Sequence, residues 1–431
     1  FAMEKQDEVC DHMSRAETTS PPVQGDDEVG AGISVKVDKM DIAKPEEDGT
    51  RELHHSETKV PVVSYWDRRA QQDKARAPEE DESSSSDESS VDLEEEYREK
   101  LRKAKRAARS EIKVSEWGQY NFASLDLDKA LGPPANNIER IHCKDVSPEE
   151  FVQRFELPAK PCIIRGLLDE WPAYKEGKSK WSFQGLQDRF GDVRLKCGED
   201  DDGYKVKLRL DHFVRYVEEQ KDDAPLYIFD ADFGDEGKPT IPLLDDFSMP
   251  PYFAEDLYSL VGEKRRPPYR WMLLGPKRSG SSMHIDPLAT SAWNSIISGR
   301  KRWVLFPPGM PKSVVKPKAW MDKPDREAID WFLLHYKDVK KGLPSHEEPI
   351  ELEMGAGETI YVPGGWWHTV LNLEDSVAVT QNFCSTTSFP AVWQDSVTGR
   401  TKLSRSWLKV LQTTRPDLYT IAQSLAGSGD G

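Results

Sequence analysis

The chain has 431 residues, of which 37% are hydrophobic and 31% charged, and its formal net charge is -17. No apolar run is long enough to span a membrane, and no basic and apolar leader opens the sequence, so we expect neither membrane association nor secretion. The five cysteines form no Cys-x-x-Cys pair, which favours an intracellular protein over a disulfide scaffold or a structural zinc site.

The charge is distributed unevenly along the chain. Residues 1–97 carry a net charge of -16 and few apolar side chains, so they cannot bury enough surface to offset the entropy cost of ordering. This region contains an acidic, serine-rich tract at residues 78–90, for which a solvated spacer is favoured over a docking site. The sequence therefore predicts a disordered acidic region over 1–97.

Residues 98–110 reverse the sign and carry a net charge of +6. Alanine, leucine, lysine and arginine dominate this segment, and these are strong helix formers. We predict a basic helical arm over 98–110. Such a segment binds nucleic acid or acts as a nuclear import signal, and the alternative is a solvated helix that pairs with the neighbouring acidic tract.

The globular part begins with mixed helix and strand signals over 111–237. Ser147 is a predicted N-cap that is followed by Pro148 at the first helical turn, and residues 161–166 resemble a buried strand. Short strands dominate beyond residue 225, and their spacing indicates a sandwich or jelly roll over 238–400. A helical extension is predicted over 401–431. The expected strands are 226–229, 270–274, 301–306, 358–362, 368–371 and 377–380.

The most informative segment contains His284 and Asp286. Residues i and i+2 of a strand point to the same face, so these two side chains are able to share one ion. The pair alone is weak evidence, because His-x-Asp arises often by chance. His368 follows a predicted Pro-Gly-Gly turn and offers a third ligand. Two histidines and a carboxylate form the facial triad of non-haem Fe(II) oxygenases. His142, His212 and His335 are better explained by packing or surface positions.

Longer motifs carry a resemblance to a known family. The segments 284–286, 301–303, 363–368 and 380–382 are similar to the jumonji-C (JmjC) 2-oxoglutarate oxygenases, and the string at 262–271 is closest to the bifunctional arginine demethylase and lysyl-hydroxylase branch. The resemblance covers about residues 98–425. It implies a mainly β, double-stranded β-helix (jelly-roll or cupin-like) core with N-terminal helical elements, Fe(II) as the metal, and 2-oxoglutarate and O2 as co-substrates.

The remaining site residues follow from the needs of 2-oxoglutarate and from this resemblance. The distal carboxylate of 2-oxoglutarate requires a cation in a dry pocket, and Lys301 is the candidate. Thr380 and Tyr227 are expected to offer hydroxyl groups to that carboxylate, and Asn294 and Ser281 to contact the co-substrate nearer the metal. The branch usually has threonine where this chain has Ser281. The residues expected to shape the pocket are Trp271, Trp367 and Asn382.

The resemblance places lysyl hydroxylation of basic nuclear proteins first and demethylation of methylarginine second. Expected partners are Arg/Ser-rich or Lys-rich proteins such as splicing factors and histones, and RNA is a further candidate partner. The alternative function is a nuclear RNA- or chromatin-binding adaptor with a non-catalytic jelly roll. The expected location is the nucleus, with the cytoplasm as a second location, and the C-terminal helices are expected to support a homo-oligomer.

Overall fold

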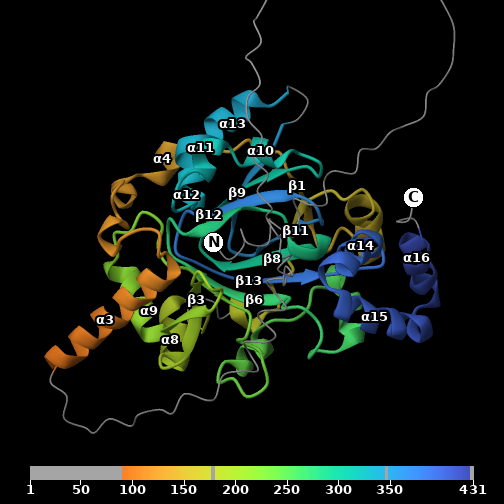
Figure 1. Ribbon diagram of the computed structural model, residues 1–431, viewed down its shortest axis with the longest axis horizontal. Coiled ribbons are helices and arrows are strands. Elements are labelled where there is room, and N and C mark those ends of the chain that lie inside the picture. The colour runs from red at the N-terminus through yellow and green to blue at the C-terminus, as the bar shows by residue number, and fades with distance from the viewer. Residues whose placement is uncertain (1–89, 176–179, 345–347, 428–431) are drawn as a thin grey trace, which may run out of the picture.

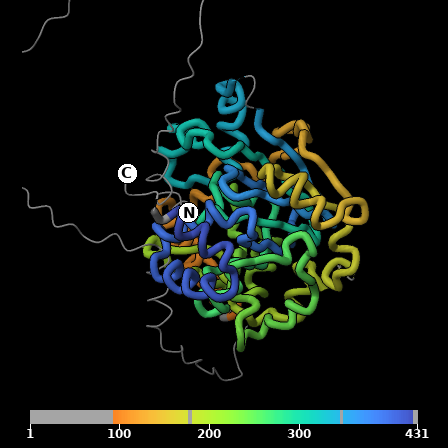
Figure 2. Tube along the Cα trace, turned by 90° about the vertical axis from the view of Figure 1, so that its right-hand side faces the viewer, coloured from red at the N-terminus to blue at the C-terminus, as the bar shows by residue number. Residues whose placement is uncertain are grey.

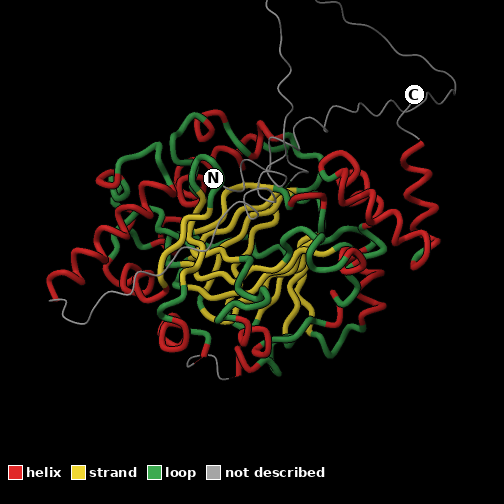
Figure 3. The backbone as a smooth tube through the Cα atoms, turned by 60° about the horizontal axis from the view of Figure 1, so that its bottom comes forward, coloured by secondary structure: helices red, strands yellow, loops and turns green. Residues whose placement is uncertain are grey.

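The computed structural model describes residues 90–175, 180–344 and 348–427. Strands from the whole globular part gather in the middle of the molecule, and helices surround them (Figures 1 and 3). The predicted disordered region 1–97 lies outside the described residues except for its last few positions, which begin a helix.

The larger sheet has seven strands in the order β1-β2-β11-β8-β13-β6-β5. Neighbouring strands are antiparallel, except that β1 and β2 run parallel. The strands that form this sheet are β1 (Glu139–His142), β2 (Cys162–Arg165), β5 (Ile228–Asp230), β6 (Arg270–Gly275), β8 (Ser291–Ser298), β11 (Glu358–Val362) and β13 (Ser376–Phe383).

The smaller sheet has four antiparallel strands in the order β10-β9-β12-β7. Buried side chains from both sheets meet in one hydrophobic cluster that includes Ile296, Trp303 and Ile360. Two facing antiparallel sheets with a shared interior confirm the predicted mainly β, jelly-roll class. The strands of this sheet are β7 (Gly280–His284), β9 (Arg300–Phe306), β10 (Ile350–Gly355) and β12 (Trp367–Asn372).

The N-terminal part supports the larger sheet through a core rich in aromatic side chains, including Trp117, Trp171 and Trp181. Ser147 caps α5 as predicted, because its hydroxyl oxygen accepts a hydrogen bond from the Glu150 backbone N–H at 3.2 Å. A hairpin of β3 (Arg194–Glu199) and β4 (Lys205–Arg209) forms a third, two-stranded sheet, and its β3 strand packs beside β5 of the larger sheet. The helices here are α3 (Ser90–Ala108), η1 (Val114–Glu116), η2 (Phe122–Ser124), α4 (Leu127–Leu131), α5 (Pro148–Phe151), η3 (Val152–Glu156), α6 (Pro172–Lys175), α8 (Phe183–Phe190) and α9 (Leu210–Glu219).

The basic segment 98–110 is not a free arm. It forms most of α3, which packs on β3, β4 and α9. Lys105 is buried and its ammonium lies 2.6 Å from the Asp222 carboxylate, beneath the Trp117 ring. The sequence pattern predicted the helix correctly, but it could not reveal that one face of the helix belongs to the core.

Short helices connect the strands. The segment between β6 and β5 contains η4 (Ile241–Asp246), η5 (Pro251–Phe253) and η6 (Leu257–Val261), and η7 (Pro287–Ala289) follows β7. Between β9 and β10, α10 (Lys312–Val315), α11 (Lys318–Met321), α12 (Ala328–Asp330), η8 (Trp331–His335) and α13 (Tyr336–Gly342) cover the outer face of the smaller sheet (Figure 1).

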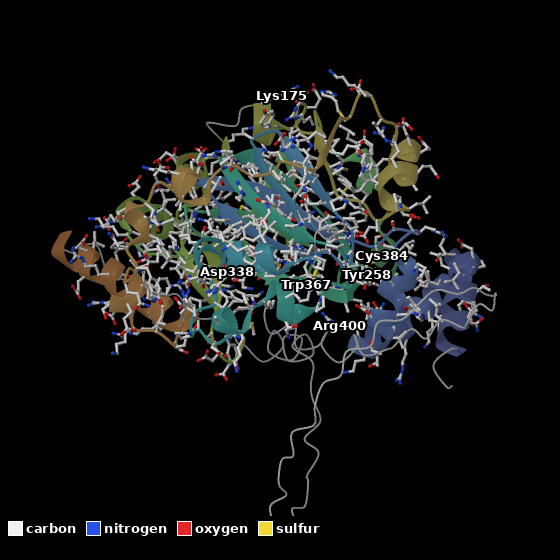
Figure 4. The ribbon with its side chains drawn as sticks, turned by 90° about the horizontal axis from the view of Figure 1, so that it is seen from above. Lys175, Tyr258, Asp338, Trp367, Cys384 and Arg400 are labelled. Atoms are coloured by element: carbon white, nitrogen blue, oxygen red, sulfur yellow. The ribbon has the colours of Figure 1, made fainter. Side chains whose placement is uncertain are left out.

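The C-terminal helices form a separate flank of the molecule (Figures 1 and 2). They are α14 (Phe389–Gly399), α15 (Thr401–Thr414) and α16 (Pro416–Gly427), so the helical extension starts at Phe389 rather than at the predicted residue 401. Their apolar faces pack with η6 and Cys384, and we call this group the C-terminal helical cluster. Figure 4 labels Tyr258 and Cys384 at its border with the strands.

The composition predicted neither a membrane span nor a disulfide scaffold, and the described residues bear on both expectations. Among these residues we found no helix that combines the length and apolar character needed to cross a bilayer. Four of the five cysteines are described, and all four are free thiols: Cys143, Cys162, Cys197 and Cys384.

Candidate metal centre

Two neighbouring strands bring the predicted histidine ligands together. The antiparallel register of β7 and β12 pairs His284 with His368, and their ring centroids are 4.1 Å apart. Asp286 lies two residues beyond the end of β7, with its carboxylate oxygens 3.8 Å from His284 Nε2 and 4.0 Å from His368 Nε2. All three side chains are buried, and one ligand atom of each lies within 4.8 Å of the others. The three predicted ligands therefore converge on one point.

The hydrogen bonds of both histidines prepare them to bind a metal. His284 Nδ1 lies 2.7 Å from the Ser282 carbonyl oxygen, and His368 Nδ1 lies 3.1 Å from the Trp366 carbonyl oxygen. A carbonyl oxygen only accepts hydrogen bonds, so each Nδ1 carries a proton, and Nε2 is the ring atom that would bind a metal. Both Nε2 atoms face Asp286.

Burial disfavours the charged form of both kinds of ligand while no cation is bound. Desolvation, followed by the neighbouring His368, holds the pKa of His284 well below its usual value, so this ring is neutral. Desolvation raises the pKa of the Asp286 carboxyl group, because a buried carboxylate has lost its water without gaining a full counter-charge. A divalent cation would supply that charge, so these residues fit Fe(II).

A β-bulge aligns Ser281 with the metal ligands. The register pairs Ser281 with Val370 and His284 with His368, so β7 contains one more residue than β12 between these pairs. Without the bulge, residues three apart would point to opposite faces of the sheet. With it, Ser281 and His284 both line the same cavity.

This cavity contains nearly all of the predicted site residues. Its walls come from β6, β7, β8, β9, β12 and β13, together with the segment that precedes β5 and the β3 strand. The predicted residues that line it are Tyr227, Trp271, Ser281, His284, Asp286, Asn294, Lys301, His368, Thr380 and Asn382.

Lys301 is a buried cation without a nearby anion. Lys301 is 1% exposed, and its Nζ donates a hydrogen bond to the Tyr227 hydroxyl at 3.3 Å. Desolvation lowers the pKa of Lys301 to about 7. No ion pair between described residues includes it, so a ligand carboxylate would complete its environment.

The two arginines beside Lys301 are already paired. Arg300 and Arg302 point away from the cavity, because neighbouring residues of a strand alternate between its faces. Arg302 is 3% exposed at its side chain and forms ion pairs at 3.1 Å, so neither arginine replaces Lys301 as an anchor. The carboxylates that pair with these two arginines are Asp128, Glu351, Glu353 and Glu374.

Asn294 and Thr380 are register partners on β8 and β13. The Asn294 Oδ1 atom is buried and has no hydrogen-bond partner in the described part of the chain. Since 2-oxoglutarate offers only acceptors, the amide nitrogen rather than this oxygen would contact it. The Thr380 hydroxyl donates to the Trp293 carbonyl oxygen at 2.8 Å. It must therefore turn before it can donate to 2-oxoglutarate.

The prediction that Trp367 shapes the pocket is wrong. Trp367 precedes His368 in β12, so its ring points to the opposite face, where its Nε1 donates to the Met310 carbonyl oxygen at 3.0 Å. Trp303, which shares a strand face with Lys301, lines the cavity instead and stacks 6.0 Å from the His368 ring. Trp271 lines the cavity as predicted.

Sequence reasoning also missed charged residues that line the cavity far from the triad in sequence. Arg109, just after α3, forms an ion pair with Glu327 at 2.8 Å, and Lys196 pairs with Glu199 on β3. These residues come from the predicted basic arm, from the β3 hairpin and from the loop before α12. Only the tertiary arrangement brings them to one cavity.

The pKa of Lys301 predicts that 2-oxoglutarate binding depends on pH. Only the ammonium form pairs with a carboxylate, so affinity should fall as pH rises above about 7, by up to about tenfold per pH unit. Binding above this pH should also take up a proton. Anaerobic calorimetry in buffers with different ionisation enthalpies measures both effects, and a constant affinity from about pH 6 to about pH 9 would contradict this prediction.

Comparison with known proteins agrees with this geometry. Residues 148–389 match the family model described as Cupin-like domain. The chain is 43% identical over 323 residues to the "Bifunctional arginine demethylase and lysyl-hydroxylase psr-1" of Caenorhabditis elegans, covering 74% of this chain and 79% of that protein. It is 41% identical over 257 residues to the "Arginine-specific demethylase JMJ22" of Arabidopsis thaliana, covering 58% of this chain and 46% of that protein. The mouse "2-oxoglutarate and iron-dependent oxygenase JMJD4" is 26% identical over 281 residues, covering 61% of this chain and 64% of that protein.

Proposed function

The chain belongs to the cupin-like JmjC family of iron- and 2-oxoglutarate-dependent oxygenases, and from this premise we propose that it hydroxylates lysine side chains of basic proteins. Demethylation of methylarginine is the second proposed activity, since the relative with 43% identity is named for both. The observation that carries the oxygenase function is one cavity that holds both the His-Asp-His triad and a buried lysine without an anion.

Each group in the cavity has a separate task. His284, Asp286 and His368 would hold Fe(II) on one face and leave positions open toward the cavity. Bound iron, with 2-oxoglutarate and O2, supplies the oxidation of a substrate C–H bond to C–OH while 2-oxoglutarate is converted to succinate and CO2. Lys301 would neutralise the distal carboxylate of 2-oxoglutarate, and the Asn294 amide would donate to the co-substrate. Trp271 and Trp303 exclude water from this space.

The two proposed activities give different products. Hydroxylation of a lysine carbon leaves a stable hydroxylysine, whereas hydroxylation of an N-methyl group gives a product that loses formaldehyde. Mass spectrometry of lysine-containing and methylarginine-containing peptides, incubated with Fe(II) and 2-oxoglutarate, separates them. We expect the lysine peptide to gain one oxygen atom. Loss of methyl groups without any oxygen gain on lysine would reverse the proposed order.

The acidic character of the described surface supports a basic substrate. Glu199 and Glu327 line the cavity but are paired with Lys196 and Arg109. The acidic cluster that supports a basic substrate therefore lies in the turn between β3 and β4, where Asp201 and Asp202 are exposed. Such a cluster attracts cationic peptides by long-range electrostatics. Arg/Ser-rich or Lys-rich proteins, including splicing factors and histones, are therefore the proposed partners.

A nuclear location and RNA binding are supported by the exposed face of α3. Lys100, Lys103 and Arg106 are exposed and three residues apart, so they form one basic stripe. No ion pair between described residues includes them. The competing proposal, a nuclear RNA- or chromatin-binding adaptor, rests on this stripe alone.

Changing Lys100, Lys103 and Arg106 together to glutamine should weaken RNA binding or nuclear accumulation. If RNA is the partner, the lost affinity should depend strongly on salt concentration, because phosphate contacts release counterions. The matched control changes Lys402, Arg405 and Lys409, which are also exposed but lie on α15. Equal RNA affinity and equal nuclear accumulation in both variants would contradict a role for the basic stripe.

Self-association through the C-terminal helices also remains a proposal. Trp407, Leu411, Leu418 and Ala422 are buried within their own subunit, so they are not available to a second copy. The exposed apolar side chain on α16 is Ile421, at 37%. Light scattering tests this by comparing the mass of an Ile421→Asp variant with that of the wild type. We expect a dimeric wild type and a monomeric variant. A variant that is as dimeric as the wild type would place the interface elsewhere.

A further inference from the structure

The loop that follows Asp286 has an unusual backbone conformation. Leu288 has φ 58° and ψ 29°, and Ala289 has φ 50°. Two consecutive non-glycine residues in the left-handed region are uncommon, because Cβ crowds the backbone there. Such a conformation persists only where the surroundings hold it in place, and this loop carries a metal ligand at its start.

The Leu288 side chain is anchored in the C-terminal helical cluster. It is partly buried against that cluster, and η7, which contains Leu288, is in contact with α14. The position that a Cβ atom would take on Gly399, at the end of α14, lies 3.5 Å from a Leu288 methyl group. The loop after the metal ligand is therefore tied to helices that lie outside the jelly roll.

The other side of the loop is fixed to the second ligand strand. The Ala289 carbonyl oxygen lies 2.1 Å from the position of a Cβ atom on Gly364, so only glycine permits this approach. Gly364 belongs to the turn that leads into β12 and His368. The Thr290 hydroxyl donates to the Pro287 carbonyl oxygen at 2.8 Å and accepts from Asn382 at 2.9 Å.

We propose that Leu288 is a positioning residue for the metal centre. Packed in the C-terminal helical cluster, it holds the left-handed turn so that the Asp286 carboxylate faces His284 and His368 before a metal binds. The C-terminal helices then support the metal site by holding Leu288, in addition to any role in stability or association. This inference rests on the metal centre described above.

The test measures metal affinity in the full chain. Co(II) is titrated under anaerobic conditions and its visible absorption bands report ligand geometry. Leu288→Ala should raise the Co(II) Kd about tenfold, the scale seen when a group that orients a ligand is removed. Leu288→Met should restore most of the affinity. The matched control is Leu408→Ala, which removes a partly buried leucine from the same cluster and should lower the Tm without changing the Kd.

The outcomes are distinguishable. Wild-type Co(II) affinity in Leu288→Ala would overturn the inference, as would an equal loss of affinity in Leu408→Ala. If Leu288→Ala does not fold, Leu288→Gly takes its place, because glycine adopts the left-handed turn easily but has no side chain to anchor. Wild-type affinity in Leu288→Gly would also overturn the inference. Failure of the wild-type protein to bind Co(II) would contradict the metal centre itself.

Discussion

Alanine in place of His284 or Asp286 is expected to reduce 2-oxoglutarate turnover below about a tenth of the wild-type rate while the protein stays folded. Each residue supplies one of only three protein ligands, and the two that remain cannot hold an iron ion in the required geometry. The hydrophobic clusters that stabilise the sheets do not depend on these side chains. Succinate release in a metal-defined assay measures the loss.

The control for this prediction is His335→Ala. His335 is a partly buried histidine on η8, outside the group of residues able to share a metal ion. It should retain turnover and bound iron. Turnover above about a tenth of wild type in Asp286→Ala, with normal iron content, would remove Asp286 from the ligand set.

Lys301→Met should raise the 2-oxoglutarate concentration needed for half-maximal turnover by roughly 100-fold or more. Removing one partner of a buried ion pair costs roughly 3–5 kcal/mol, because the remaining charge stays buried and unpaired. Methionine keeps the length and apolar stem of the side chain, so the wall of the cavity should be preserved. Initial rates at varied 2-oxoglutarate, and direct binding to the Mn(II)-loaded protein, measure the change.

Arg300→Met is the matched control, since Arg300 is the adjacent cation on the other face of β9. Its carboxylate partners lie outside the cavity, so the dependence on 2-oxoglutarate should stay at the wild-type value. An unchanged dependence in Lys301→Met would place the anchor of the distal carboxylate on another residue of the cavity.

The sequence predicted the parts of this molecule that depend on local pattern. Runs of β-branched and aromatic residues indicated seven of the strands, including the buried strand at 161–166, and Ser147 indicated a helix start. The spacing of His284 and Asp286, together with a third ligand at His368, indicated the metal centre, although β7 ends at His284 and Asp286 lies in the extended backbone just beyond it. The alternation of side chains along a strand also predicts that Trp367 faces away from the cavity, because it is adjacent to the metal ligand His368 in β12.

Other features depend on tertiary contacts that no local pattern encodes. The bulge in β7 that turns Ser281 toward the cavity appears only in the register with β12. The basic residues of α3 look alike in sequence, yet Lys105 is buried against Asp222 while Lys103 is exposed. Likewise, Arg109 reaches the cavity only because α3 packs beside the β3 hairpin.

The most direct test of the central claim is an incubation of the protein with Fe(II), 2-oxoglutarate and a lysine-rich peptide under 18O2. If the triad and Lys301 couple the two substrates as described, succinate should carry one labelled oxygen atom, and its amount should match the hydroxylysine formed on the peptide. Succinate without label, or labelled succinate with no modified lysine or methylarginine in any basic peptide tested, would contradict the claim.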